Sequence, residues 1–146
     1  MFGEDVDCQH LTRAHTILRL IGLSLGWKML EKRILLVEDD LELAEVMATV
    51  LREEGYLVDL AATAGQAQEH LARFSYAVVI ADWRLPDGDG TLIAEWGSTL
   101  GAKTLVMSGY LRQMPGGRAE PHRTLAKPFR ANLLLDAVHD CIGVAA

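Results

Sequence analysis

Two hydrophobic patterns alternate along the chain from residue 33 onward. Short apolar runs are typical of buried strands, whereas apolar residues three and four positions apart are typical of helices that pack on one side. The predicted strands are 33–37, 56–62, 77–81, 103–107 and 123–126. The predicted helices are 41–55, 64–74, 91–97 and 130–142, and a turn at 86–90 precedes the third of them.

This alternation predicts an α/β domain with a parallel sheet, right-handed crossovers and helices on both faces. Helical spacing also indicates which side chains the helices bury, and Gly55 is the expected stop of the first helix. The side chains expected on the buried faces are Leu43, Val46, Met47, Val50, Leu51, Ala64, Ala67, Leu71, Phe74, Leu134, Ala137, Val138 and Cys141.

The chain divides into an N-terminal extension, residues 1–32, and a domain, residues 33–146. The extension carries four acidic and four basic residues, so the net charge of −6 belongs to residues 33–146. Its apolar positions from Leu11 to Leu30 could form one helix. Three interpretations stay open: an added helix that packs on the domain or a partner, an amphipathic segment, or upstream sequence read from a start codon chosen too early.

Composition narrows the class of protein. Half of the 146 residues are apolar and 23% are charged, which is typical of a globular domain, and the negative net charge argues against nucleic-acid binding. Cys8 and Cys141 match neither a disulfide framework nor a metal-binding spacing, so we expect a reducing cytoplasm. Because Arg19 and Lys28 interrupt the apolar stretch 16–30, we expect neither a signal peptide nor membrane insertion.

Polar residues follow four of the five predicted strands. Glu38 and Asp39 follow the first strand, Asp82 the third, Ser108 the fourth and Lys127 the fifth. The carboxyl ends of parallel strands form one edge of a sheet, and ligands bind outside that edge. We therefore expect three carboxylates, one hydroxyl and one ammonium to converge there.

The three expected carboxylates predict a metal ion. Two carboxylates about 4 Å apart repel each other by roughly 4 kcal/mol at an effective dielectric constant of about 20. Such groups need a cation or must give up ionisation. Oxygen ligands without nearby histidine or cysteine favour Mg²⁺, which also binds phosphate oxygens and water. A carboxylate beside Mg²⁺ can attack phosphorus as a nucleophile.

Four motifs at these strand ends resemble the response-regulator receiver domain, the phosphoacceptor of two-component signalling. They are ILLVEDD (34–40), VVIADWRLPDGDG (78–90), LVMSGY (105–110) and LAKPF (125–129). The resemblance covers residues 33–142. It implies a flavodoxin-like, doubly wound sheet of five strands in the order 2-1-3-4-5, in which the first and third strands are neighbours.

The resemblance also implies a role for each acidic residue. Asp82 would receive a phosphoryl group from a phosphohistidine. Asp39 and Asp82 would bind Mg²⁺, and Glu38 would contribute directly or through water. The backbone carbonyl of Arg84 would be a further ligand.

Further roles are implied around the acidic cluster. Lys127 would pair first with Asp82 and then with the phosphate, Ser108 would donate a hydrogen bond to the phosphate, and the Lys127–Pro128 bond would be cis. The backbone N–H of Trp83 would donate to the phosphate. The residues expected to flank the site and tune phosphate lifetime are Arg84 and Tyr110.

Two features depart from the receiver pattern. Thr124 occupies the position three before the lysine, which is usually aromatic in receivers. The segment between Ser108 and Lys127 is rich in helix breakers, so we expect a short or irregular fourth helix there. These breakers are Pro115, Gly116, Gly117 and Pro121.

Other polar residues have structural explanations. We expect Asp40 to cap the first helix, Asp87 and Asp89 to be turn residues, and Cys141 to pack as a small apolar side chain. The histidines share no metal-binding spacing. They are expected to be surface or core residues: His10, His15, His70, His122 and His139.

Three hypotheses of function follow. The favoured one is a phosphorylated switch that receives its phosphoryl group from a histidine kinase or histidine phosphotransfer protein. It would signal by contact with an unidentified protein and, with the chain ending at Ala146, without an output domain. The second is an interaction module that works without phosphorylation. The third, a phosphohydrolase of the haloacid-dehalogenase type, is rejected because Arg84 replaces the second aspartate. Homodimerisation is left open.

Overall fold

A computed structural model of the chain describes residues 32–109 and 122–143. Its central sheet has five parallel strands in the order β2-β1-β3-β6-β7, which confirms the expected 2-1-3-4-5 topology. These strands are β1 (Arg33–Val37), β2 (Leu57–Ala61), β3 (Val78–Asp82), β6 (Lys103–Ser108) and β7 (Arg123–Ala126). The predicted strands all form, and β3 and β6 each extend one residue beyond their predicted ends.

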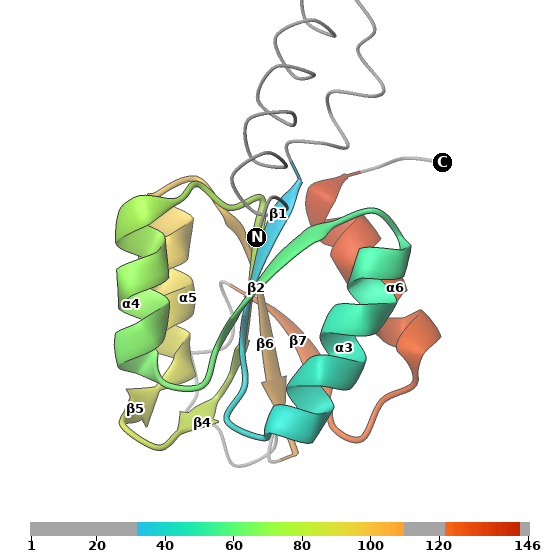
Figure 1. Cartoon of the computed structure of the whole chain (residues 1–146), viewed down its shortest axis with the longest axis horizontal. Coiled ribbons are helices and arrows are strands. Elements are labelled where there is room, and N and C mark those ends of the chain that lie inside the picture. Colours follow the sequence, from blue (N-terminus) through green and yellow to red (C-terminus); the bar gives the residue numbers. More distant parts are fainter. Residues whose placement is uncertain (1–31, 110–121, 144–146) are drawn as a thin grey trace, which may run out of the picture.

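Four helices cover the sheet in the part of the chain that the structure describes. They are α3 (Leu41–Glu53), α4 (Ala64–Arg73), α5 (Gly90–Thr99) and α6 (Ala131–Ile142). Helices α3 and α6 lie on one face of the sheet and α4 and α5 on the other (Figure 1). Between β3 and α5, where a simple turn was predicted, β4 (Arg84–Leu85) and β5 (Gly88–Asp89) pair as a small antiparallel hairpin.

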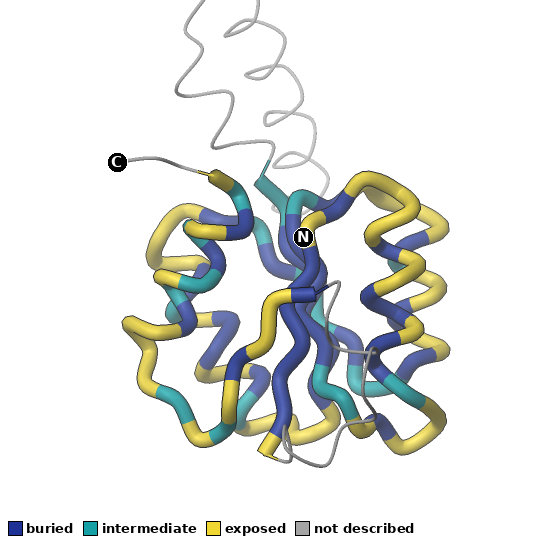
Figure 2. The backbone as a smooth tube through the Cα atoms, turned by 180° about the vertical axis from the view of Figure 1, so that it is seen from behind, coloured by how far each residue is buried: buried dark blue, intermediate teal, exposed yellow. Residues whose placement is uncertain are grey.

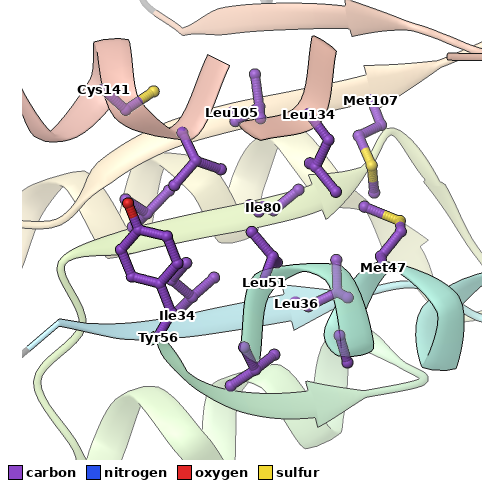
Figure 3. Close-up of a cluster of buried hydrophobic side chains, with 14 of the residues drawn as sticks. Ile34, Leu36, Met47, Leu51, Tyr56, Ile80, Leu105, Met107, Leu134 and Cys141 are labelled. Carbon is purple, nitrogen blue, oxygen red and sulfur yellow. The ribbon is translucent and has the colours of Figure 1, made fainter. Parts of the chain in front are cut away.

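The core consists of two layers, one on each face of the sheet. Alternate residues of each strand face opposite layers, so Ile34 and Leu36 pack under α3 and α6 while Leu35 and Val37 pack under α4 and α5. Large side chains fill the first layer, as Figure 3 shows for Met47, Leu51 and Leu134 and their neighbours. The inner strands β1, β3 and β6 are buried almost throughout, whereas the edge strand β7 and the outer faces of the helices are largely exposed (Figure 2).

Two side chains expected in the core are exposed. Val46 is 62% exposed, because α3 turns Ala44, Met47, Ala48 and Leu51 toward the sheet. Phe74 is 41% exposed, because the chain leaves the helical conformation at this residue, which is the C-cap of α4. The buried faces of these two helices are therefore narrower than the helical spacing predicted.

Local signals at the start and end of α3 are confirmed. The carboxylate of Asp40 accepts a hydrogen bond from the N–H of Leu43, as expected for an N-cap. Gly55 follows α3 with a φ of 96°, a left-handed conformation that glycine adopts without strain. Together they direct the chain from the carboxyl end of β1 back to the start of β2.

Candidate functional site

The sheet brings three carboxylates together at its carboxyl edge. Glu38 and Asp39 follow β1, and Asp82 is the last residue of β3, the neighbouring strand. The register pairs Val37 of β1 with Ala81 of β3, so the residues that follow this pair, Glu38 and Asp82, lie side by side at the carboxyl edge. One carboxylate oxygen of each of the three residues lies within 4.8 Å of the others. The predicted convergence of the three carboxylates is confirmed.

The ammonium of Lys127 lies between two of these acids. Its Nζ is 2.6 Å from Oε2 of Glu38 and 3.2 Å from Oδ2 of Asp82. The expected pair of Lys127 with Asp82 is present, and Lys127 makes a closer contact with Glu38 that was not predicted. Glu38 is 2% exposed, so its charge depends on a buried partner, which the lysine supplies.

Backbone groups hold Lys127 and Glu38 in place. The N–H of Lys127 donates to the carbonyl of Ser108, and the Lys127–Pro128 peptide bond is cis, as expected. The N–H of Asp40 donates to Oε1 of Glu38 at 3.1 Å. Glu38 therefore binds a backbone amide with one oxygen and Lys127 with the other, and its orientation is fixed from both sides.

Burial and charge shift the pKa values of the site in a consistent way. Burial raises the pKa of Glu38 and of Asp82, and Lys127 offsets only part of this effect. Burial lowers the pKa of Lys127, but the hydrogen bonds and charges of Glu38 and Asp82 outweigh it and leave the pKa raised. The lysine is therefore held in its charged form. The raised pKa values of the two acids mean that their ionised forms are disfavoured, and a further positive charge nearby would stabilise them.

The three acids fit a Mg²⁺ ion by the chemistry of their donor atoms. All three offer carboxylate oxygens, which is the ligand type that Mg²⁺ prefers, and Asp39 at the cluster is exposed to solvent. Ion ligation by these residues and by the Arg84 carbonyl stays a prediction. The single ammonium of Lys127, which contacts Glu38 and Asp82, does not balance the charge of three carboxylates.

Trp83 and Gly90 fix the backbone next to Asp82. The N–H of Trp83 donates to the carbonyl of Met107 at 2.8 Å, and its expected donation to a phosphate stays a prediction. The N–H of Gly90 donates to the carbonyl of Trp83 at 2.7 Å. A Cβ atom at Gly90 would lie only 1.8 Å from the carbonyl oxygen of Asp82, so only glycine fits at the start of α5.

The structure also describes three further residues that were singled out in the sequence: Ser108, Thr124 and Arg84. Ser108 is the last residue of β6 and is buried, and Thr124 is exposed on β7. The guanidinium of Arg84 lies 4.8 Å from the centre of the Trp83 ring. The roles expected for these side chains stay predictions. Tyr110 and the expected irregular fourth helix lie outside the described residues.

The acids of the 86–90 turn have capping roles in place of simple turn roles. Asp89 caps α5 by accepting hydrogen bonds from the N–H and the hydroxyl of Thr91. Asp87 accepts from the N–H groups of Ala64 and Gly65 at the start of α4. The sequence analysis missed this second, long-range contact, for which the only sequence signal was an acidic residue in a turn after Asp82.

The fold and site define an open, doubly wound α/β domain with an acidic, lysine-paired centre at the switch point of the sheet. A family model described as "Response regulator receiver domain" matches residues 34–139. The chain belongs to the response-regulator receiver family, the signalling domain of two-component systems.

Solved structures agree with this assignment. The chain is 28% identical to a CheY-like receiver domain protein from Methanospirillum hungatei, with a TM-score of 0.72 over 77% of this chain and 94% of that one. It is 26% identical to the response regulator TrrA from Thermotoga maritima, with a TM-score of 0.69 over 75% of this chain and 98% of that one. The TrrA crystal structure is a complex with Mg²⁺ and BeF.

Curated relatives match through part of their length. The chain is 42% identical over 65 residues to the transcriptional regulatory protein PmrA of Pectobacterium parmentieri, which is 44% of this chain and 29% of that protein. It is 29% identical over 108 residues to DltR of Streptococcus agalactiae, which is 70% of this chain and 48% of that protein. Among the described residues, no helix is long and apolar enough to cross a membrane.

Proposed function

We propose that this protein is a phosphoacceptor of two-component signalling and that Asp82 carries the phosphoryl group. The observation that carries the proposal is the meeting of Glu38, Asp39 and Asp82 within 4.8 Å, with Lys127 bonded to two of them. Family membership and the likeness to TrrA, whose structure holds Mg²⁺, support the same assignment. The receiver would be residues 33–146, preceded by the extension 1–32.

In the proposed reaction a carboxylate oxygen of Asp82 attacks the phosphorus of a phosphohistidine. The phosphorus–nitrogen bond breaks, and the imidazole leaves with its electron pair and takes up a proton. Asp39 and Asp82, with Glu38 directly or through water and the Arg84 carbonyl, would hold Mg²⁺, which supplies positive charge to the phosphoryl oxygens. Lys127 binds a phosphoryl oxygen, and Ser108 donates a hydrogen bond to another.

Lys127 is suited to this role by its present partners. Its raised pKa keeps it charged, so it can exchange part of its contact with Asp82 for a contact with the phosphoryl group. The bond to Glu38 keeps its Nζ at the site during this exchange. The lysine therefore provides a preorganised positive charge where negative charge accumulates.

The partners follow from this chemistry. The donor is a histidine kinase or a histidine phosphotransfer protein, and the output is contact with a further protein in the cytoplasm. The alternative is a receiver-fold interaction module that works without phosphorylation. Thr124 favours this alternative, because an exposed threonine occupies the usual aromatic switch position.

A small acyl phosphate separates these two functions. The protein is incubated with acetyl phosphate and Mg²⁺ and the intact mass is measured. We expect the mass of one phosphoryl group in the wild type and none in Asp82→Asn. Asp59→Asn is the matched control, because it changes an aspartate of similar chemistry on β2 and should retain the modification. No modification of the wild type would favour the interaction module.

A further inference from the structure

The hairpin formed by β4 and β5 is attached to Asp82 at its base. Arg84 is two residues after Asp82 and pairs with Asp89 in the hairpin. Gly90 follows Asp89, and the N–H of Gly90 donates a hydrogen bond to the carbonyl of Trp83 at 2.7 Å. The backbone N–H of Arg84 partly offsets the burial that raises the pKa of the Asp82 carboxyl. The hairpin backbone is therefore fixed to the main chain directly after Asp82.

The tip of the same hairpin is attached to α4. Oδ1 of Asp87 accepts a hydrogen bond from the N–H of Ala64 at 2.7 Å, and Oδ2 accepts one from the N–H of Gly65 at 3.0 Å. These are the first two residues of α4, whose N–H groups have no partner within the helix. The two carboxylate oxygens of Asp87 thus join the hairpin to residues that precede it by 23 (Ala64) and 22 (Gly65) positions in the sequence.

The remaining amides at this helix end are satisfied locally. Oγ1 of Thr63 accepts from the N–H of Gln66 at 3.1 Å, and Oε1 of Gln66 accepts from the N–H of Ala62 at 2.7 Å. Thr63 and Gln66 thus serve the N–H groups of Gln66 and Ala62 and leave those of Ala64 and Gly65 to Asp87. The bonds from Asp87 complete the cap of α4 and hold the hairpin tip on this helix end.

Contacts around Asp87 agree with a fitted junction. A Cβ atom at Gly65 would lie 3.5 Å from Oδ2 of Asp87, and one at Gly88 would lie 3.8 Å from Cβ of Ala64. The amides of Ala64 and Gly65 lower the pKa of the Asp87 carboxyl, so the side chain is charged at neutral pH. The carboxylate faces the positive end of the helix dipole, which adds to the two hydrogen bonds.

We propose that Asp87 is a positioning residue for the phosphoacceptor site. By holding the hairpin tip on α4 it fixes the main chain of Arg84, which lies two residues after Asp82 and whose carbonyl is an expected Mg²⁺ ligand. The Mg²⁺ part of this inference rests on the proposed function. Loss of an outer partner of a metal ligand typically lowers metal affinity by about tenfold or more.

The test compares Asp87→Ala with Thr63→Ala. Both variants remove a side-chain cap from the same helix end, but only Asp87→Ala releases the hairpin. Mg²⁺ is titrated into each protein by calorimetry. We expect Asp87→Ala to raise the dissociation constant for Mg²⁺ about tenfold and Thr63→Ala to leave it unchanged. Asp87→Asn keeps an acceptor for one of the two amides and is expected to fall between Asp87→Ala and the wild type.

A second readout needs no metal ion. Amide hydrogen exchange at Arg84 is measured by NMR in Mg²⁺-free buffer, because Arg84 pairs with Asp89 in the hairpin and its exchange reports how firmly the hairpin is held. We expect several-fold faster exchange in Asp87→Ala and wild-type exchange in Thr63→Ala. If the helix end alone mattered, both variants would change alike.

The outcomes separate the two proposals. Equal Arg84 exchange in Asp87→Ala and the wild type would overturn the positioning role, whatever the protein does with phosphate. A wild type that neither binds Mg²⁺ nor accepts a phosphoryl group would overturn the proposed function. In that case the Arg84 exchange rates still decide whether Asp87 positions the hairpin.

Discussion

Two clusters of polar side chains lie on the sheet, and they contain similar groups in different proportions. At the carboxyl edge, Glu38, Asp39 and Asp82 lie together, and the ammonium of Lys127 is bonded to Glu38 and Asp82. The second cluster lies toward the amino ends of the strands and is formed around Asp59 of β2. The two clusters differ in how well their negative and positive groups balance.

In the second cluster every charge has a matching partner. The hydroxyl of Tyr76 donates to Oδ2 of Asp59 at 2.7 Å, and Nε of Arg33 lies 3.4 Å from the same oxygen. The Arg33 guanidinium also lies 4.3 Å from the centre of the Phe74 ring. Burial and the bond to Asp59 raise the pKa of Tyr76, so the phenol stays a neutral donor.

The two clusters therefore differ in the ratio of negative to positive groups. One carboxylate with one guanidinium and one phenol is balanced and stabilises the fold. Three carboxylates with one ammonium leave an excess of negative charge, and burial raises the pKa values of Glu38 and Asp82. An excess of buried negative charge disfavours the ionised acids, and a cation bound at the proposed site would offset it.

The largest expected difference concerns the two cations. Lys127→Ala should slow phosphoryl transfer from acetyl phosphate by about 10²–10³-fold, because it removes the fixed positive charge at the phosphoryl group. Arg33→Ala should leave the rate unchanged, because Arg33 belongs to the other cluster. Initial rates at saturating Mg²⁺, followed by intact mass, check this. Similar rates in the two variants would contradict the distinction.

The two acids should have opposite effects on stability in Mg²⁺-free buffer. Asp59→Asn should lower the free energy of unfolding by about 1–3 kcal/mol, because Tyr76 and Arg33 lose a charged partner. Asp82→Asn should raise it, because burial and the charge of Asp39 disfavour the ionised Asp82 side chain. Urea unfolding checks the two signs, and a loss of stability in both variants would argue against an excess of negative charge.

A smaller effect is expected for the phenol. Tyr76→Phe removes one hydrogen bond to Asp59 and should lower the free energy of unfolding by about 1 kcal/mol. Combined with Asp59→Asn, the two losses should be less than additive, because both remove the same interaction. Strict additivity in urea unfolding would show that the two side chains act independently.

The smallest effect concerns a buried histidine beside the start of β7. Burial lowers the pKa of His122, whose Nδ1 is hydrogen-bonded to the hydroxyl of Thr104. Below its ordinary pKa of 6.5 the unfolded chain binds more protons than the folded one. Stability is therefore fully present above pH 6.5 and is lost as the pH falls toward the lowered pKa.

The pH dependence can be assigned with two variants. Unfolding of the wild type, His122→Gln and His139→Gln is measured from pH 7.5 to 5. We expect the loss of stability attributable to His122 to disappear in His122→Gln and to persist in His139→Gln, which changes a more exposed histidine. An unchanged slope in His122→Gln would contradict the assignment.

The sequence predicted the elements well because strands and helices have local periodicities. The alternating runs located all five strands of the central sheet, and Asp40 was recognisable as a cap from its position before the helix. Strand order came from the resemblance to receivers, and it brought Asp39 and Asp82 together. Periodicity alone would not have placed β1 beside β3.

Long-range polar contacts were harder to predict. Asp87 reaches the start of α4, and Asp59 meets Tyr76, across separations that local patterns do not encode. The shorter contact of Lys127 with Glu38 depends on the burial of Glu38, which only the packed structure reveals. Val46 and Phe74 were misplaced because helical spacing gives the direction of a face and overestimates its width.

The central claim is that Asp82 is the residue that accepts the phosphoryl group. After incubation with acetyl phosphate and Mg²⁺, borohydride reduces an acyl phosphate of aspartate to homoserine, and peptide sequencing by mass spectrometry locates the change. We expect homoserine at position 82 and unmodified aspartate at positions 39 and 59. Homoserine at another aspartate, with Asp82 intact, would contradict it.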